Sequence, residues 1–162
     1  MGTNKLFSKT FYWLRERSTI NPYIGYKLRT MCNKLPYVDY TSTLQHEYVN
    51  DKYPLLLQKY AASIAATTDM PSIKHLEIPA AGCLTFMEVT EKNNAKRTGF
   101  IDNKTCVYIN ESNYVEKFNE FLKTRDNPKW EKIASDGRKF ALENFNNDVA
   151  VNSLVDLIKE LI

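Results

Sequence analysis

Two short apolar segments, each followed by a helical pattern, constrain the fold of this 162-residue chain most strongly. Ala61–Ala66 and Cys83–Val89 are predominantly apolar, which is typical of strands covered on both faces of a parallel sheet. The stretch between them, Ser72–Ala81, predicts a helix that ends at Gly82. Together they predict a β–α–β unit with a crossover helix.

The same alternation extends toward both ends of the chain. Further strands are predicted over Lys9–Arg15, Tyr37–Thr43 and Thr105–Ile109, and Thr90–Arg97 is predicted to be a polar loop. Helices are predicted over Tyr23–Lys34, from Asn50 to Tyr60, and over residues 114–124, 128–144 and 147–162. The order predicts one α/β domain over residues 1–162, a Rossmann-like three-layer sandwich with a mostly parallel sheet of about five strands.

The last two predicted helices each carry apolar residues three or four positions apart, and so each has an apolar face. In the first these residues are Trp130, Ile133, Ala134, Phe140 and Ala141; in the second they are Val149, Leu154, Leu157, Ile158 and Leu161. We therefore expect the terminal helices over residues 114–162 to pack on the domain.

The net charge of +3 is unevenly placed. Met1–Lys34 holds seven basic residues and one acidic residue, which suits a phosphorylated ligand, a nucleic acid or an anionic membrane surface. Neither zinc-finger spacing nor an aromatic RNA-binding signature occurs, so no nucleic-acid partner is expected. Peripheral contact with a membrane stays open.

The expected compartment is the cytoplasm, with the inner face of the membrane as an alternative place. No apolar run approaches the roughly 20 residues of a membrane span, and the N-terminal residues lack the layout of a secretory signal. The sequence has no C-x-x-C motif among its three cysteines, Cys32, Cys83 and Cys106, and this favours buried, reduced thiols.

Several common catalytic motifs are absent from the sequence. The five glycines match neither the dinucleotide-binding nor the P-loop spacing, and no G-x-S-x-G nucleophile motif occurs. His46 and His75 have no metal-binding partner at helical spacing. No metal and no cofactor are therefore expected.

The most informative stretch is the loop and helix after the strand over Ala61–Ala66. Thr67, Thr68 and Asp69 follow this strand, and Glu77 lies in the next helix with seven residues between the two acids. Each carboxylate can accept bonds from adjacent hydroxyls of a sugar. The alternative is that Asp69 caps the helix and Glu77 is only solvated.

Four segments together resemble the C-terminal half of glycosyltransferases with two Rossmann domains, the B architecture. They are Lys74–Leu84, Gly99–Phe100, Cys106–Asn110 and Ile133–Arg138. The resemblance is good over Ser63–Asn144 and loose from Tyr23 to the C-terminus. In that family two glutamates separated by seven residues bracket the donor site, and the second usually binds the nucleotide ribose.

The resemblance assigns expected roles to individual residues. Glu77 matches the second glutamate, and Asp69 stands in place of the first. Family members also use basic side chains for the donor pyrophosphate, for which Arg15, Arg17, Lys27 and Lys74 are candidates. Thr67 and Thr68 would complete the site through turn hydroxyls and helix N–H groups.

We therefore expect a nucleotide-sugar-binding domain of a glycosyltransferase of the hexosyltransferase class. Since 162 residues do not hold both halves of such an enzyme, the chain is expected to be a fragment, a donor subunit or a binding module that needs a separate acceptor domain. The alternative is a protein-interaction or self-association module, with Phe7, Phe11, Tyr12 and Trp13 as its surface.

Overall fold

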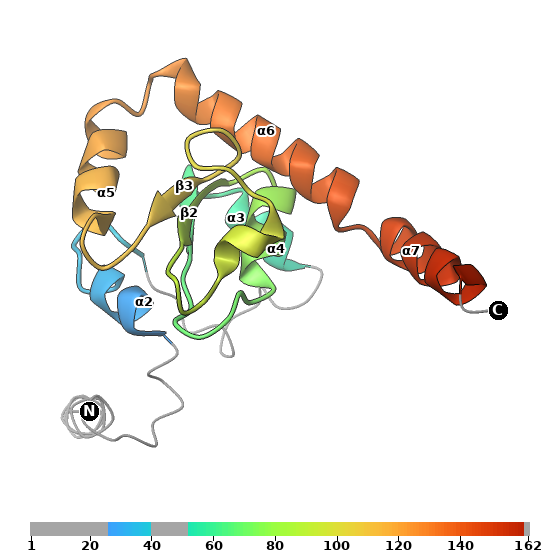
Figure 1. Cartoon of the computed structure of the whole chain (residues 1–162). Helices are drawn as coiled ribbons and strands as arrows, with labels where there is room; N and C mark the ends of the chain where they lie inside the picture. The colour runs from blue at the N-terminus through green and yellow to red at the C-terminus, as the bar shows by residue number, and fades with distance from the viewer. Residues whose placement is uncertain (1–25, 40–51, 161–162) are drawn as a thin grey trace, which may run out of the picture.

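A parallel three-stranded sheet forms the centre of the protein (Figure 1). The computed structural model describes residues 26–39 and 52–160. The strands are β1 (Ala62–Ala65), β2 (Leu84–Glu88) and β3 (Val107–Ile109), in the order β1-β2-β3. The predicted α/β class and the parallel pairing are confirmed.

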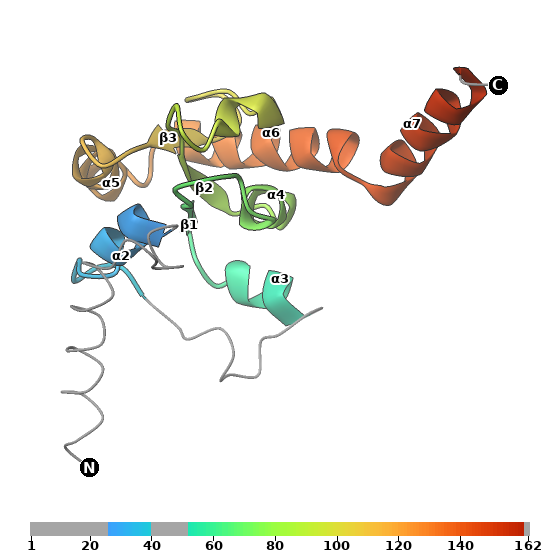
Figure 2. The ribbon, with the colours of Figure 1, turned by 60° about the horizontal axis from the view of Figure 1, so that its bottom comes forward.

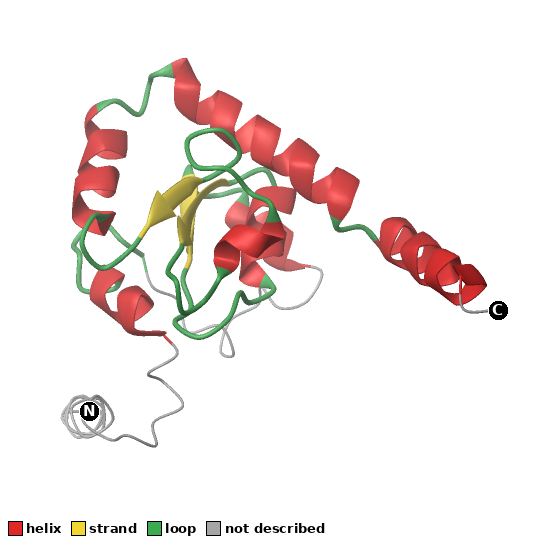
Figure 3. Cartoon of the chain, in the orientation of Figure 1, coloured by secondary structure: helices red, strands yellow, loops and turns green. Residues whose placement is uncertain are grey.

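Helices connect and surround the strands (Figure 3). Asn127 caps α6, its side chain accepting a hydrogen bond from the Lys129 N–H at 2.9 Å, and Pro128 fills the first helical position. The helices are α2 (Lys27–Cys32), α3 (Tyr53–Leu57), α4 (Lys74–Ala80), the 3₁₀ helix η3 (Ala95–Thr98), α5 (Tyr114–Lys123), α6 (Pro128–Asn144) and α7 (Asn147–Glu160).

Helix α4 ends where the sequence predicts. Gly82 takes a φ of +83°, a conformation that favours glycine, and the chain then enters β2. Pro79 lies inside the last turn of α4, which stays one short helix of seven residues. Gly82 thus has the structural role expected of a residue that ends a helix.

Helices cover both faces of the sheet (Figure 2). On one face, Phe86 packs in a cluster with Leu28 of α2 and Phe118 of α5. On the other face, Met87 packs with Leu76 of α4 and Ala141 of α6. These two clusters sandwich β2, in which every residue is buried.

Three of the five expected strands are observed as strands in the described residues. Lys9–Arg15 lies outside the described residues. The prediction of a strand beginning at Tyr37 is wrong for Tyr37–Asp39, which form a turn and an irregular segment; residues 40–43 lie outside the description. The Val38 N–H donates to the Leu35 carbonyl oxygen at 3.2 Å, so this backbone closes a turn.

The terminal helices differ in how they pack. Helix α5 buries Phe118, and α6 buries Trp130, Ile133, Gly137 and Ala141. Helix α7 buries no residue and leads away from the sheet (Figure 1). The expected packing on the domain thus holds for α5 and α6, and α7 lies outside that core.

All three cysteines are buried and unbonded, as the sequence predicts. Burial raises the pKa of each of the Cys32, Cys83 and Cys106 thiols to about 12. In the described ranges, no helix combines the length and the apolar character needed to cross a bilayer.

Candidate functional site

The side chain of Asn93 joins the carboxyl ends of β1 and β2. Its Nδ2 donates to the carbonyl oxygens of Thr67 and Glu88, both at 2.9 Å. Its Oδ1 accepts from the N–H groups of Thr90 and Ala95 at 3.0 and 3.1 Å. Asn93 is 1% exposed, and these bonds satisfy its amide completely, so it fixes the loops at this edge of the sheet.

Glu88 ends the central strand and is only 2% exposed. Its Oε2 has no hydrogen-bond partner. Burial, helped by the nearby Glu111 carboxylate, raises the pKa of Glu88 to about 7, although a backbone hydrogen bond from Thr67 lowers it in part. A carboxyl group in this environment is readily protonated near neutral pH.

His75 lies in the first turn of α4 and is fully buried. Its Nδ1 accepts a hydrogen bond from the Ser72 N–H at 3.2 Å, while its Nε2 has no partner. Burial lowers the pKa of His75, so the ring is neutral at physiological pH. His75 is thus a core histidine; His46 lies outside the described residues.

The turn after β1 is held by its own contacts. The Thr67 hydroxyl donates to the Met70 carbonyl oxygen, and Thr67 is buried. The Thr68 hydroxyl accepts from the Lys27 N–H at 3.4 Å, and Asp69 pairs with Lys92. Asp69 and Glu77 are therefore each paired with a different lysine, and no described contact joins the two acids.

Glu77 and Lys74 form an ion pair on α4, with Nζ and Oε2 2.8 Å apart. Their side chains are 38% and 36% exposed, respectively. The Lys74 ammonium also lies 3.4 Å from the ring centroid of Tyr53 on α3, a cation–π contact. Lys74 is thus oriented by two neighbours and stays accessible to a ligand.

The other basic residues predicted for the site divide into two groups. Arg15 and Arg17 lie outside the described residues. Lys27 pairs with Glu111 at 2.6 Å, beside the carboxyl end of β3. Of the basic candidates within the described ranges, Lys74 alone lines a cleft that the structure shows.

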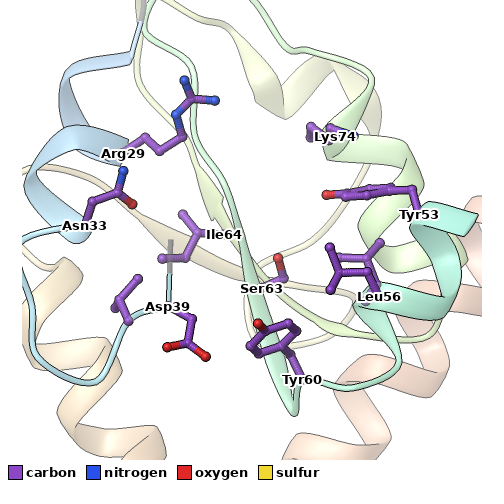
Figure 4. Close-up of a pocket in the computed structure, with 11 residues that line it drawn as sticks. Arg29, Asn33, Asp39, Tyr53, Leu56, Tyr60, Ser63, Ile64 and Lys74 are labelled. Atoms are coloured by element: carbon purple, nitrogen blue, oxygen red, sulfur yellow. The ribbon is translucent and has the colours of Figure 1, made fainter. Parts of the chain in front are cut away.

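That cleft follows β1 between α2 on one side and α3 and α4 on the other, with a volume of about 190 Å³ (Figure 4). Arg29 and Lys74 lie at one end of it, and Asp39 and Tyr60 lie at the other. Tyr60 precedes β1 and Lys74 follows it, so the cationic end is the end near the carboxyl terminus of the strand.

The walls of the cleft combine polar groups with an apolar floor. Ser63 and Ile64 of β1 lie along its base, and Asn33 projects from the end of α2. Burial raises the pKa of Tyr60, and the nearby Asp39 carboxylate also raises it. The guanidinium of Arg29 lies 3.9 Å from the Tyr26 ring centroid, which holds its planar group in place.

Sequence reasoning missed four residues of this region: Asn93, Glu88, Arg29 and Asp39. Glu88 carries a readable signal, because it is the acidic residue of an otherwise uncharged strand. Asn93 sits in a polar loop with a second asparagine, and nothing local distinguishes the buried one. Arg29 and Asp39 meet β1 only through tertiary packing.

Two further results bear on this region. In residues 26–39 and 52–160, no cluster of three or more His, Cys, Asp or Glu side chains is arranged to hold a metal ion. Comparison with protein-family models, curated proteins and solved structures gives no match.

Proposed function

We propose that this chain is the donor-binding domain of a glycosyltransferase, with a Rossmann-like fold that holds a nucleoside diphosphate sugar. The observation that carries the proposal is Lys74, which lines the cationic end of the cleft opposite Arg29 and forms an ion pair with Glu77. A diphosphate needs positive charge, and a ribose needs a carboxylate acceptor for its hydroxyls. Lys74 and Arg29 supply the charge at this end of the cleft, and Glu77, paired with Lys74, supplies the carboxylate beside it.

The position of the pair also supports the proposal. Ligands of parallel α/β sheets bind outside the carboxyl ends of the strands. Lys74 opens the helix that follows β1, and the Glu77 side chain reaches back toward it, as side chains on a helix lean toward the N-terminus. The resemblance of Lys74–Leu84 to glycosyltransferases assigns the ribose to Glu77.

In this proposal the enzyme works in the cytoplasm, and its acceptor site lies on a separate domain or subunit. Asp69 departs from the glutamate of the family and pairs with Lys92, and its contact with the donor sugar stays a prediction. Thr67 and Thr68 act through the turn that they stabilise. No metal is required.

The proposal is tested by ligand-dependent thermal stability and by calorimetric titration with a panel of nucleoside diphosphates. Binding to the folded state raises the melting temperature in proportion to the logarithm of ligand concentration. Replacing Glu77 with Gln removes a charge-assisted bond and is expected to weaken binding about tenfold, with little change in folding.

The matched control is Glu143→Gln. Glu143 is an exposed acid on α6 with a lysine at 3.9 Å, so it mimics the ion pair of Glu77 away from the cleft. Its substitution is expected to change affinity less than about twofold. Failure of every nucleoside diphosphate to raise the melting temperature at millimolar concentration contradicts the proposed function.

A further inference from the structure

The cleft continues beyond its cationic end to a second polar end that nucleotide binding by Lys74 and Glu77 leaves unused. There Asp39 and Tyr60 face each other (Figure 4). A carboxylate accepts several hydrogen bonds, so Asp39 has capacity for hydroxyls of a ligand.

The size of the cleft restricts what it takes. Sites for drug-sized ligands measure about 300–1,000 Å³, whereas this cleft measures about 190 Å³. It therefore suits one ring of a nucleotide sugar rather than the whole molecule. The remaining question is whether that ring is the nucleobase or the sugar.

The chemistry of the walls favours the sugar. A nucleobase gains binding energy by stacking on an aromatic face, but the Lys74 ammonium already lies over the ring of Tyr53, 3.4 Å from its centroid. Asp39, Asn33 and Ser63 instead offer acceptors and donors along the cleft, as a ring bearing several hydroxyls requires.

We propose that the cleft along β1 holds the sugar ring of the donor, with its phosphate between Arg29 and Lys74 and its hydroxyls bonded to Asp39. This inference rests on the proposed function and makes Asp39 the residue that distinguishes a nucleoside diphosphate sugar from the bare diphosphate. Tyr60 lines the same end of the cleft and offers its hydroxyl as a second polar group beside Asp39.

The experiment compares the calorimetric affinities of UDP with UDP-glucose and of GDP with GDP-mannose. Asp39→Asn is expected to weaken binding of the nucleotide sugar about tenfold and to leave the diphosphate within about twofold. Tyr60→Phe keeps the ring and is expected to give a smaller loss with the same selectivity. Asp156→Asn on α7, an exposed aspartate 3.5 Å from a lysine, is the control and leaves both affinities unchanged.

The outcomes separate this inference from the proposed function. Glu77→Gln is expected to weaken binding of the diphosphate and of the nucleotide sugar by the same factor. Suppose that the diphosphates bind through Glu77, but Asp39→Asn and Tyr60→Phe weaken binding of both ligand classes equally or change neither affinity. The sugar assignment is then overturned, and the proposed function stands.

A separate titration with glucose 1-phosphate covers the opposite case. If no diphosphate binds but glucose 1-phosphate does, and Asp39→Asn weakens it, the nucleotide part is overturned and the cleft remains a sugar-phosphate site. If inorganic phosphate binds as tightly as glucose 1-phosphate and Asp39→Asn has no effect, the sugar assignment is overturned. Absence of all binding overturns both proposals.

Discussion

Helices α6 and α7 follow each other in the chain and share the same local design, yet only α6 joins the core. Each starts after an asparagine whose side chain accepts a hydrogen bond from an early N–H, Asn127 from Lys129 and Asn146 from Val149. Each carries an apolar face. Helix α6 buries four residues, and α7 buries none.

The difference lies in what each helix meets. Gly137 of α6 lets the helix approach the chain just before β3, where an added Cβ would be 2.2 Å from the Thr105 carbonyl oxygen. At its N-terminal end Trp130 packs edge-on against Phe121 of α5, with ring centroids 5.5 Å apart. Within the described residues α7 buries no side chain, and its Leu154 and Leu157 are 57% and 56% exposed. Amphipathicity therefore sets which face a helix offers, and not whether it is covered.

The largest expected effect comes from Trp130→Ala. Trp130 is 3% exposed, and its Nε1 donates to the Thr124 carbonyl oxygen at 2.9 Å. The substitution leaves a cavity and removes this hydrogen bond, and we expect it to lower the free energy of unfolding by about 3–5 kcal/mol. Urea unfolding followed by circular dichroism measures this, and a loss below about 1 kcal/mol would mean that α6 packs no more firmly than α7.

The pH dependence of the unfolding free energy tests the buried state of the Glu88 carboxyl in the core. The pKa of Glu88 is raised to about 7 in the folded protein from an ordinary value of 4.5. Between these values the unfolded chain loses the proton first, so stability from this group is full below pH 4.5 and is lost as the pH rises through 7.

The titration is read as the difference between wild type and Glu88→Gln, because His75 acts in the opposite direction. The pKa of His75 is lowered, so its contribution is lost as the pH falls below about 6.5. Between pH 4.5 and 8, the free energy of unfolding of Glu88→Gln is expected to rise by about 3 kcal/mol relative to the wild type, at 1.36 kcal/mol per pKa unit. A difference that stays flat with pH contradicts the buried, protonated carboxyl.

Gly137→Ala tests the close approach of α6 directly. Alanine has the higher helix propensity, by about 1 kcal/mol in an exposed position. At Gly137 the new methyl would collide with the Thr105 carbonyl, so we expect a net destabilisation of about 1–3 kcal/mol. Ser135→Ala, at an exposed position on the same helix, is the control and should be neutral or slightly stabilising.

The smallest effect is expected for Leu154→Ala in α7. The side chain is 57% exposed and belongs to none of the core clusters of the described residues, so the change in unfolding free energy should stay below about 0.5 kcal/mol. The measurement is urea unfolding of the isolated chain. A loss above 2 kcal/mol, approaching the value for Trp130, would mean that α7 is covered in solution and would remove the contrast between the helices.

Much of the fold can be predicted from the sequence because the relevant signals are local. The apolar segments that become β1 and β2, the stop at Gly82 and both ends of α6 depend on a few neighbouring residues. The strand expected from Tyr37 is wrong over Tyr37–Asp39 because the preceding turn engages this backbone before it can pair with another strand. The alternation of side chains there is typical of a strand, but the turn that precedes it prevents strand pairing.

The candidate site could be predicted only in part. Glu77 and Lys74 are near each other in the sequence and on one helical turn, so their pairing follows from spacing. Asp69 and Glu77 are also near in sequence, but the ion pair of Asp69 with Lys92 depends on where the loop after β2 lies. Proximity along the chain did not bring the two acids together.

The sequence by itself determined the parallel α/β class, the helix boundaries set by caps and glycines, and the buried state of the cysteines, since each depends on short-range patterns and apolar content. The tertiary structure alone decided that Arg29 and Asp39 line a cleft with Lys74, that Asn93 joins two strand ends, and that Glu88 is buried with an unpaired oxygen. The physical reason is that burial and ion pairing depend on which residues, distant in the chain, supply the surrounding atoms.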